Sequence, residues 1–297
     1  SLDAVLAHID ADLENSIARL LELMRIESIS TDPAYAEECM AAAQWLVDDL
    51  NDIGFDAELR PTPGHPMVMA TGGTGGTHSL FYGHYDVQPV DPLDLWDNPP
   101  FEPRLEDTKN GPVIRGRGSS DDKGQLMTFV EACRAYKTVT GSLPAKISIF
   151  FEGEEESGSP SLVPYMTEYA DELKADVALI CDTGMVEPNT PSIVTMLRGM
   201  ATQEITIKGP DKDLHSGMYG GPSINPIRVL TKALASIHDD TGRVTLDGFY
   251  DGVPELPEQV AQQWRDLDFD AERFLGDVGL SVPAGEADRS VLEQIWS

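Results

Sequence analysis

Residues 79–86, SLFYGHYD, are the most informative segment of the sequence. Its apolar part, 79–82, is followed at once by Gly83, His84 and, two residues later, Asp86. A short apolar run bounded by turn residues is typical of a buried strand. In α/β proteins the groups that carry chemistry usually stand at the carboxyl ends of strands. The stretch therefore predicts a buried strand with a histidine and a carboxylate at its end.

Three more segments place acidic residues in the same kind of position: SSDDKG at 119–124 after an Arg-Gly turn, EEESG at 154–158 after the apolar run 147–151, and Asp182 after the apolar run 177–180. A single His-x-Asp pair, or three adjacent glutamates, is more often a structural pair or a solvated helix face. Four such groups at strand ends are different, because carboxylates gathered at one sheet edge repel one another and require a cation. The pattern predicts a divalent metal site assembled from several strand ends.

The pattern outward from this stretch alternates between helices and strands. Apolar residues recur at helical spacing over 2–24 and over 36–50, with Gly54 as a stop, and helices are also predicted at 124–138 and 161–173. Strands are predicted at 67–70, 79–82, 146–151 and 177–180. Strands separated by helices predict an α/β fold with a mostly parallel central sheet and helices on both faces.

The pattern changes near residue 200. Residues 201–208 alternate like a half-buried strand, 224–237 are helical in pattern, and a further alternating strand begins at Arg243. This order predicts a separate, smaller α+β module. We therefore expect a metal-binding catalytic domain over 1–199 and a second domain over 200–297, in which 258–264 and 289–296 show helical spacing.

Composition limits the partners and the compartment. The 297 residues contain 51 acidic and 21 basic side chains, a net charge of -30, which disfavours nucleic acids and anionic membranes as partners. The three cysteines are odd in number and far apart, as expected for reduced thiols in a cytosol. Neither a membrane span nor a signal peptide is evident, so we expect a soluble, cytoplasmic protein. A phosphate-binding loop and a serine-hydrolase elbow are also missing from the sequence.

Six ordered motifs resemble those of the M20 metallopeptidases, and most closely the carnosinase-like dipeptidases. They are GHYDVQP at 83–89, WD at 96–97 with PF at 100–101, GRGSSDDKG at 116–124, EESGS at 155–159, Asp182, and DLHSG at 213–217 with GG at 220–221. The resemblance runs through nearly the whole chain. It implies a catalytic domain of the two-zinc exopeptidase type, interrupted by a smaller α+β lid that also forms a homodimer.

The resemblance also implies a role for each matching residue. His84 and Asp182 would hold one metal, Glu156 the other, and Asp121 would bridge both. Glu155 would be the general base, because one of two adjacent glutamates can face the metal while its neighbour faces the water. Two cations about 3.5 to 4 Å apart need such a shared carboxylate to lower their mutual repulsion.

Other matching residues would support this centre. Asp86 would orient the ring of His84, and His215 would reach into the partner's site and hydrogen-bond the oxyanion of the tetrahedral intermediate. The relatives have a cis peptide after the bridging aspartate, so we expect one between Asp121 and Asp122. For Glu154 the pattern indicates no role beyond solvation.

Together these features predict a metal-dependent hydrolase that cleaves the amide bond of dipeptides or small peptides, with a metal-bridging water activated by Glu155. Two divalent ions are expected, zinc in the first place, with manganese or cobalt as alternatives. Two other functions stay open: an M20 deacylase acting on N-acyl amino acids, and a non-catalytic dimerisation or binding fragment.

The sequence departs from the family in one respect. Its relatives complete the second metal site with a histidine far toward the C-terminus, whereas no histidine follows His238 here. We therefore expect a C-terminally truncated chain with an incomplete second metal site, which puts the catalytic competence of the chain by itself in question.

Overall fold

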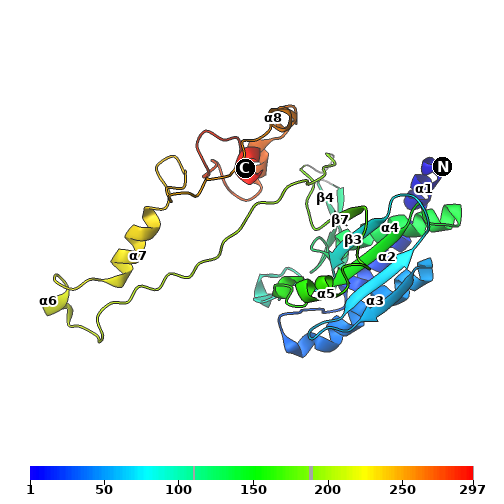
Figure 1. Cartoon of the computed structure of the whole chain (residues 1–297), viewed down its shortest axis with the longest axis horizontal. Coiled ribbons are helices and arrows are strands. Elements are labelled where there is room, and N and C mark those ends of the chain that lie inside the picture. Colours follow the sequence, from blue (N-terminus) through cyan, green and yellow to red (C-terminus); the bar gives the residue numbers. More distant parts are fainter. Residues whose placement is uncertain (110, 187–189, 297) are drawn as a thin grey trace. The chain divides into compact units, whose positions relative to one another are not determined.

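The computed structural model describes residues 1–109, 111–186 and 190–296, and the chain forms two compact units, Ser1–Thr183 and Gly184–Ser297. In Figure 1 the first unit runs from blue to green and the second from yellow-green to red. The predicted assignment of a catalytic domain to 1–199 and a lid to 200–297 stays a prediction.

A five-stranded sheet forms the centre of the first unit (Figure 1). Its strands, in spatial order, are β1 (Asp56–Arg60), β2 (Met67–Gly72), β6 (Ile147–Glu152), β3 (Ser79–His84) and β7 (Val177–Ile180). β3 pairs in parallel with β6 and β7, whereas β2 pairs antiparallel with β1 and β6. The predicted α/β class is confirmed.

The sheet is mixed rather than mostly parallel, for a simple geometric reason. β1 and β2 are joined only by residues 61–66, and a parallel crossover needs about a dozen residues or more. The short connection therefore makes β1 and β2 antiparallel. β6 lies between β2 and β3, and it is antiparallel to β2 and parallel to β3. The parallel part, β6–β3–β7, is the part whose strand ends carry the acidic motifs.

Helices cover both faces of this sheet, as predicted. The helices of the unit are α1 (Leu2–Ala11), α2 (Leu13–Met24), α3 (Ala36–Ile53), α4 (Lys123–Thr140) and α5 (Leu162–Glu168), with short 3-10 turns η1 (Pro33–Tyr35), η2 (Leu93–Leu95) and η3 (Glu155–Ser157). α3 ends at Gly54 with a φ of 101°, in the left-handed conformation that favours glycine. This confirms the predicted stop.

Alternation along the strands divides the core in two. Val68 of β2 and Phe151 of β6 pack in the larger cluster, together with α2, α3 and α4. Met69 and Phe150, their neighbours along the same strands, pack in a second cluster with Tyr165 of α5. Successive side chains of a strand point to opposite faces, so the two clusters lie on the two faces of the sheet.

A two-stranded antiparallel hairpin, β4 (Arg104–Thr108) with β5 (Gly111–Arg115), completes the first unit. Neither this hairpin nor β1 was predicted. The residues of both are rich in charged side chains and include few buried positions, so they lack the apolar run by which the other strands were found.

The second unit contains helices and loops: α6 (Ser216–Tyr219), α7 (Pro226–Ala235), α8 (Glu258–Arg265), α9 (Ala271–Gly276) and α10 (Val291–Trp296). α7, α8 and α10 lie where helical spacing predicted them. The strands predicted at 201–208 and from Arg243 are wrong, since 201–208 has no regular structure and only an isolated bridge joins His238 to Val244. A strand forms by pairing, and no described segment pairs with 201–208.

No helix in the described ranges has both the length and the apolar character that crossing a bilayer requires.

Candidate metal centre

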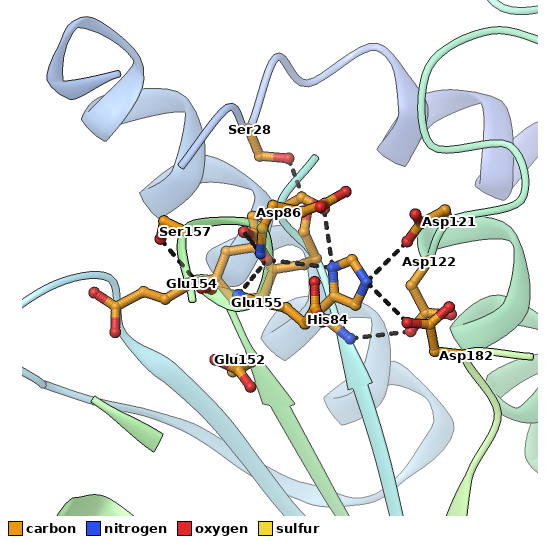
Figure 2. A network of polar contacts seen from close by, with 12 residues as sticks. Ser28, His84, Asp86, Asp121, Asp122, Glu152, Glu154, Glu155, Ser157 and Asp182 are labelled. Atoms are coloured by element: carbon orange, nitrogen blue, oxygen red, sulfur yellow. Dashed lines mark hydrogen bonds and ion pairs between the residues drawn. The ribbon is translucent and has the colours of Figure 1, made fainter. Parts of the chain in front are cut away.

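His84 stands at the carboxyl end of β3, fully buried, and its ring is surrounded by carboxylates. Its Nδ1 lies 3.1 Å from the backbone oxygen and 3.3 Å from Oδ1 of Asp86. Its Nε2 lies 3.0 Å from Oδ1 of Asp121 and 3.7 Å from Oδ2 of Asp182. Figure 2 shows Asp86 on one side of the ring and the other two aspartates on the opposite side.

Three of the predicted ligands form one group. His84, Asp121 and Asp182 each offer a ligand atom, and these atoms all lie within 4.8 Å of one another. His84 ends β3 and Asp182 follows β7, and the parallel pairing of these two strands brings their ends to one edge. Asp121 comes from the turn before α4. One imidazole nitrogen and two carboxylate oxygens suit zinc and other divalent metals.

Electrostatics at this group favour a cation. Burial raises the pKa of Asp182, and the charge of Asp121 raises it further, while His84 opposes the shift. Burial also disfavours a charged ring at His84, but hydrogen bonding and charge from Asp86 outweigh it and raise the pKa of His84 to about 10. A metal ligand must be deprotonated, so a divalent cation bound here would displace the proton that the raised pKa of His84 favours.

Asp86 joins the histidine to the glutamate turn. Its buried carboxylate accepts hydrogen bonds from the backbone N–H of Glu155 at 3.3 Å and of Glu156 at 3.0 Å, and it also contacts the ring of His84. One side chain thus fixes both the imidazole and the start of η3, as Figure 2 shows.

The two adjacent glutamates of η3 are half-buried. Burial raises the pKa of both carboxyl groups; for Glu155 the charge of His84 opposes the shift and those of Asp182 and Asp86 add to it. Oε2 of Glu156 accepts a hydrogen bond from Nε2 of Gln88 at 2.5 Å. Glu156 lies outside the group of three, so the structure brings together three of the four predicted ligands.

Glu154 was wrongly interpreted as a solvated residue. It is buried, and its Oε1 accepts from the backbone N–H of His65 at 3.2 Å while its Oε2 accepts from that of Ser161 at 3.1 Å. A Cβ at Gly64 would come within 1.5 Å of Oε1, so only glycine permits this approach. Glu154 therefore ties the loop before β2 to the segment after η3.

A buried carboxylate next to Asp121 also had no role in the sequence analysis. Oδ2 of Asp122 accepts the backbone N–H of His84 at 3.0 Å, which joins the turn before α4 to the end of β3. The Asp121–Asp122 peptide is cis, which confirms the prediction made from the resemblance.

His215 belongs to the second unit, where it precedes α6 and is exposed. Its predicted reach into a partner's site stays a prediction.

With this geometry in place, the comparison with known proteins identifies the family. Residues 80–280, more than half of the chain, match peptidase family M20/M25/M40, and the chain belongs to this family. It is 31% identical to the Cys-Gly metallodipeptidase DUG1 of Candida albicans, over 94% of this chain and 61% of the relative. It is 27% identical to the human Beta-Ala-His dipeptidase, over 99% of this chain and 61% of the relative. The predicted M20 and carnosinase-like resemblance is confirmed.

Among solved structures, the M20 family metallo-carboxypeptidase Sso-CP2 from Sulfolobus solfataricus is similar, with a TM-score of 0.74 and 30% sequence identity. The match covers 94% of this chain and 62% of that one. The chain thus spans about three-fifths of the length of these relatives.

Proposed function

We propose that this chain carries the metal centre of an M20 peptidase that hydrolyses the amide bond of dipeptides or other small peptides. The observation on which the proposal rests is the group formed by His84, Asp121 and Asp182, whose ligand atoms lie within 4.8 Å of one another. The relatives add support, since two of them are named as dipeptidases.

In the proposed centre, His84 and Asp182 would hold one cation, Glu156 would hold a second, and Asp121 would serve both. The side chain of Asp121 is 60% exposed, which leaves its other oxygen accessible. Gln88 donates to Oε2 of Glu156, and Oε1 would be the ligand atom for the second cation. The nitrogen-and-carboxylate donor set favours zinc, with manganese and cobalt as the alternatives.

A bound divalent cation would supply Lewis acidity, polarising the substrate carbonyl and lowering the pKa of water. Glu155 takes the proton of the attacking water and passes it to the leaving amine. Its raised pKa, caused first by burial, makes its carboxylate a stronger base than an exposed glutamate. Asp86 holds the ring of His84 and the backbone of Glu155 in one geometry.

Three further parts of the proposal concern the whole protein. His215 donates a hydrogen bond to the oxyanion in the site of a second copy, and the second unit forms the homodimer contact that this requires. The reaction takes place in the cytoplasm. The support for these points is the DLHSG motif at 213–217 and the cysteine pattern.

Zinc binding tests the centre. The dissociation constant of the full chain is measured by competition with a chromophoric chelator. We expect His84→Ala to lose more than the 10- to 100-fold in affinity that is typical of an outer-shell partner. His238→Ala, a histidine of the second unit, is the matched control and should bind as the unaltered chain does. A chain that does not bind zinc, manganese or cobalt would support the non-catalytic alternative.

Substrate class is tested with the purified protein. It is assayed on a panel of dipeptides, including Cys-Gly and β-Ala-His, and of N-acyl amino acids, with and without chelator. The proposal expects chelator-sensitive cleavage of dipeptides. Cleavage of the N-acyl amino acids alone would assign the deacylase function instead.

A further inference from the structure

Two chain segments carry ligands of the proposed metal centre: 84–87, here called the histidine arm, and 118–123, the aspartate arm. The short segment 26–29, which follows helix α2, contacts the histidine arm. Oγ of Ser28 donates to the backbone oxygen of Tyr85 at 2.7 Å, and the backbone oxygen of Ser28 accepts from Val87 at 2.9 Å. Ile29 and Val87 also form a β-bridge. Tyr85 and Val87 flank Asp86, so the segment holds the chain on both sides of that carboxylate. Figure 2 shows Ser28 beside this strand end.

The same segment contacts the aspartate arm through Lys123. This lysine is the first residue of α4, two positions after Asp121, and it is fully buried. Its Nζ donates to the backbone oxygen of Ile26 at 2.7 Å and to that of Leu23 at 3.1 Å. Leu23 lies in the last turn of α2, and Ile26 lies two residues after the end of this helix. A buried amino group is costly unless it is hydrogen-bonded, so these two contacts fix the start of α4 against the end of α2 and the segment after it.

Close packing leaves little freedom between the two arms. A Cβ at Gly118 would lie 3.1 Å from Cγ1 of Val87 and 3.2 Å from Cδ of Lys123, and its φ of +79° also favours glycine. The turn that carries Asp121 therefore packs closely against Val87, which follows His84 in the chain, and against the aliphatic part of Lys123.

We propose that Lys123 and Ser28 are positioning residues that use segment 26–29 to set the distance between His84 and Asp121. The inference rests on the proposed metal centre. Two hydrogen bonds join the arms directly, one between the ring of His84 and Asp121 and one from the backbone N–H of His84 to Asp122, and segment 26–29 adds contacts to both arms. The segment holds the ligands in the binding geometry in advance, so the cation does not have to order them.

Lys123→Met tests the proposal, because methionine retains most of the apolar stem and removes the donor. In the full chain we expect zinc binding about 10- to 100-fold weaker, the loss typical of an outer-shell partner. The rise in Tm on adding zinc should shrink accordingly. Lys137→Met, the same replacement near the other end of α4, is the control and should keep the zinc affinity of the unaltered chain.

Ser28→Ala is the second variant, and it decides the matter if Lys123→Met does not fold. It removes one hydroxyl from the other arm, and zinc binding should weaken in the same direction. A merely structural role would lower the Tm of the metal-free chain and leave the zinc affinity of the folded chain unchanged. The inference is overturned if both folded variants, or Ser28→Ala alone where Lys123→Met does not fold, bind zinc like the unaltered chain while His84→Ala does not. If the unaltered chain binds no metal, both the proposed function and this inference fail.

Discussion

The two units of the chain differ in how they use their apolar residues. In the first unit every residue of β6 is buried, and packed clusters lie on both faces of the sheet. In the second unit Ile193, Leu197 and Met200 are each more than 80% exposed, and Ala261 and Leu292 are the buried apolar side chains among its described residues. A rigid core holds strand ends in place, and the candidate metal centre lies on the unit that has one.

A matched pair of leucines gives the largest contrast between the units. Leu46 in α3 is fully buried, whereas Leu197 is 86% exposed. Leu46→Ala should lower the free energy of unfolding by about 2 to 5 kcal/mol, because it leaves a cavity in the core. Leu197→Ala should change it by less than about 0.5 kcal/mol. Urea denaturation of the full chain measures both, and equal effects would contradict the contrast.

Glutamates give a second contrast. Glu154→Ala should cost about 1 to 3 kcal/mol, because it leaves the backbone N–H groups of His65 and Ser161 without their acceptors. Glu204→Ala, at an exposed position of the second unit, should be near neutral. The same denaturation measurement applies. A neutral Glu154→Ala would restore the interpretation of this residue as solvated.

A half-buried ion pair and an exposed one give the smallest contrast. Burial favours the neutral form of Glu131, but hydrogen bonds from Arg19 and Ser16 and the charge of Arg134 outweigh it and lower the pKa of Glu131. A lowered folded-state pKa adds stability above the ordinary value of 4.5, and this contribution is lost as the pH falls through the folded-state pKa.

Glu131→Gln should therefore cost about 1 kcal/mol at neutral pH and less in acid, since the amide retains an acceptor oxygen but not the charge. Glu258→Gln changes the pair with Arg265 in α8, where both side chains are largely exposed, and should have little effect. Unfolding free energies at pH 7 and pH 4 test this. A cost for Glu131→Gln that does not depend on pH would argue against the assigned charge interaction.

The sequence revealed those parts of the fold that depend on local patterns. The apolar runs located β2, β3, β6 and β7, and helical spacing located α3, α4 and α7. β1 was missed because it is rich in charged residues and only partly buried, so it lacks the apolar run that located the other strands. The strand expected at 201–208 does not form. Alternating polarity shows that a segment is able to pair, but it does not show which other segment will pair with it.

The candidate site divides in the same way. The strand and turn pattern pointed to the segments that contain His84, Asp121 and Asp182, and the resemblance to the M20 family singled out these three residues within them. The burial of Glu154 and Lys123 could not be predicted, because a charged residue can be buried only where distant groups satisfy it. For Lys123 these groups are backbone carbonyls about 100 positions earlier in the chain. Every residue has a backbone carbonyl, so the residue types do not show which carbonyl will accept from the lysine.

Anomalous diffraction at the zinc absorption edge, from crystals of the full chain grown with zinc, locates the metal centre. We expect a peak within ligand distance, about 2.0 to 2.2 Å, of Nε2 of His84 and of carboxylate oxygens of Asp121 and Asp182. A well-ordered first unit with no peak at these three side chains, or with its zinc bound elsewhere, would contradict the proposed metal centre.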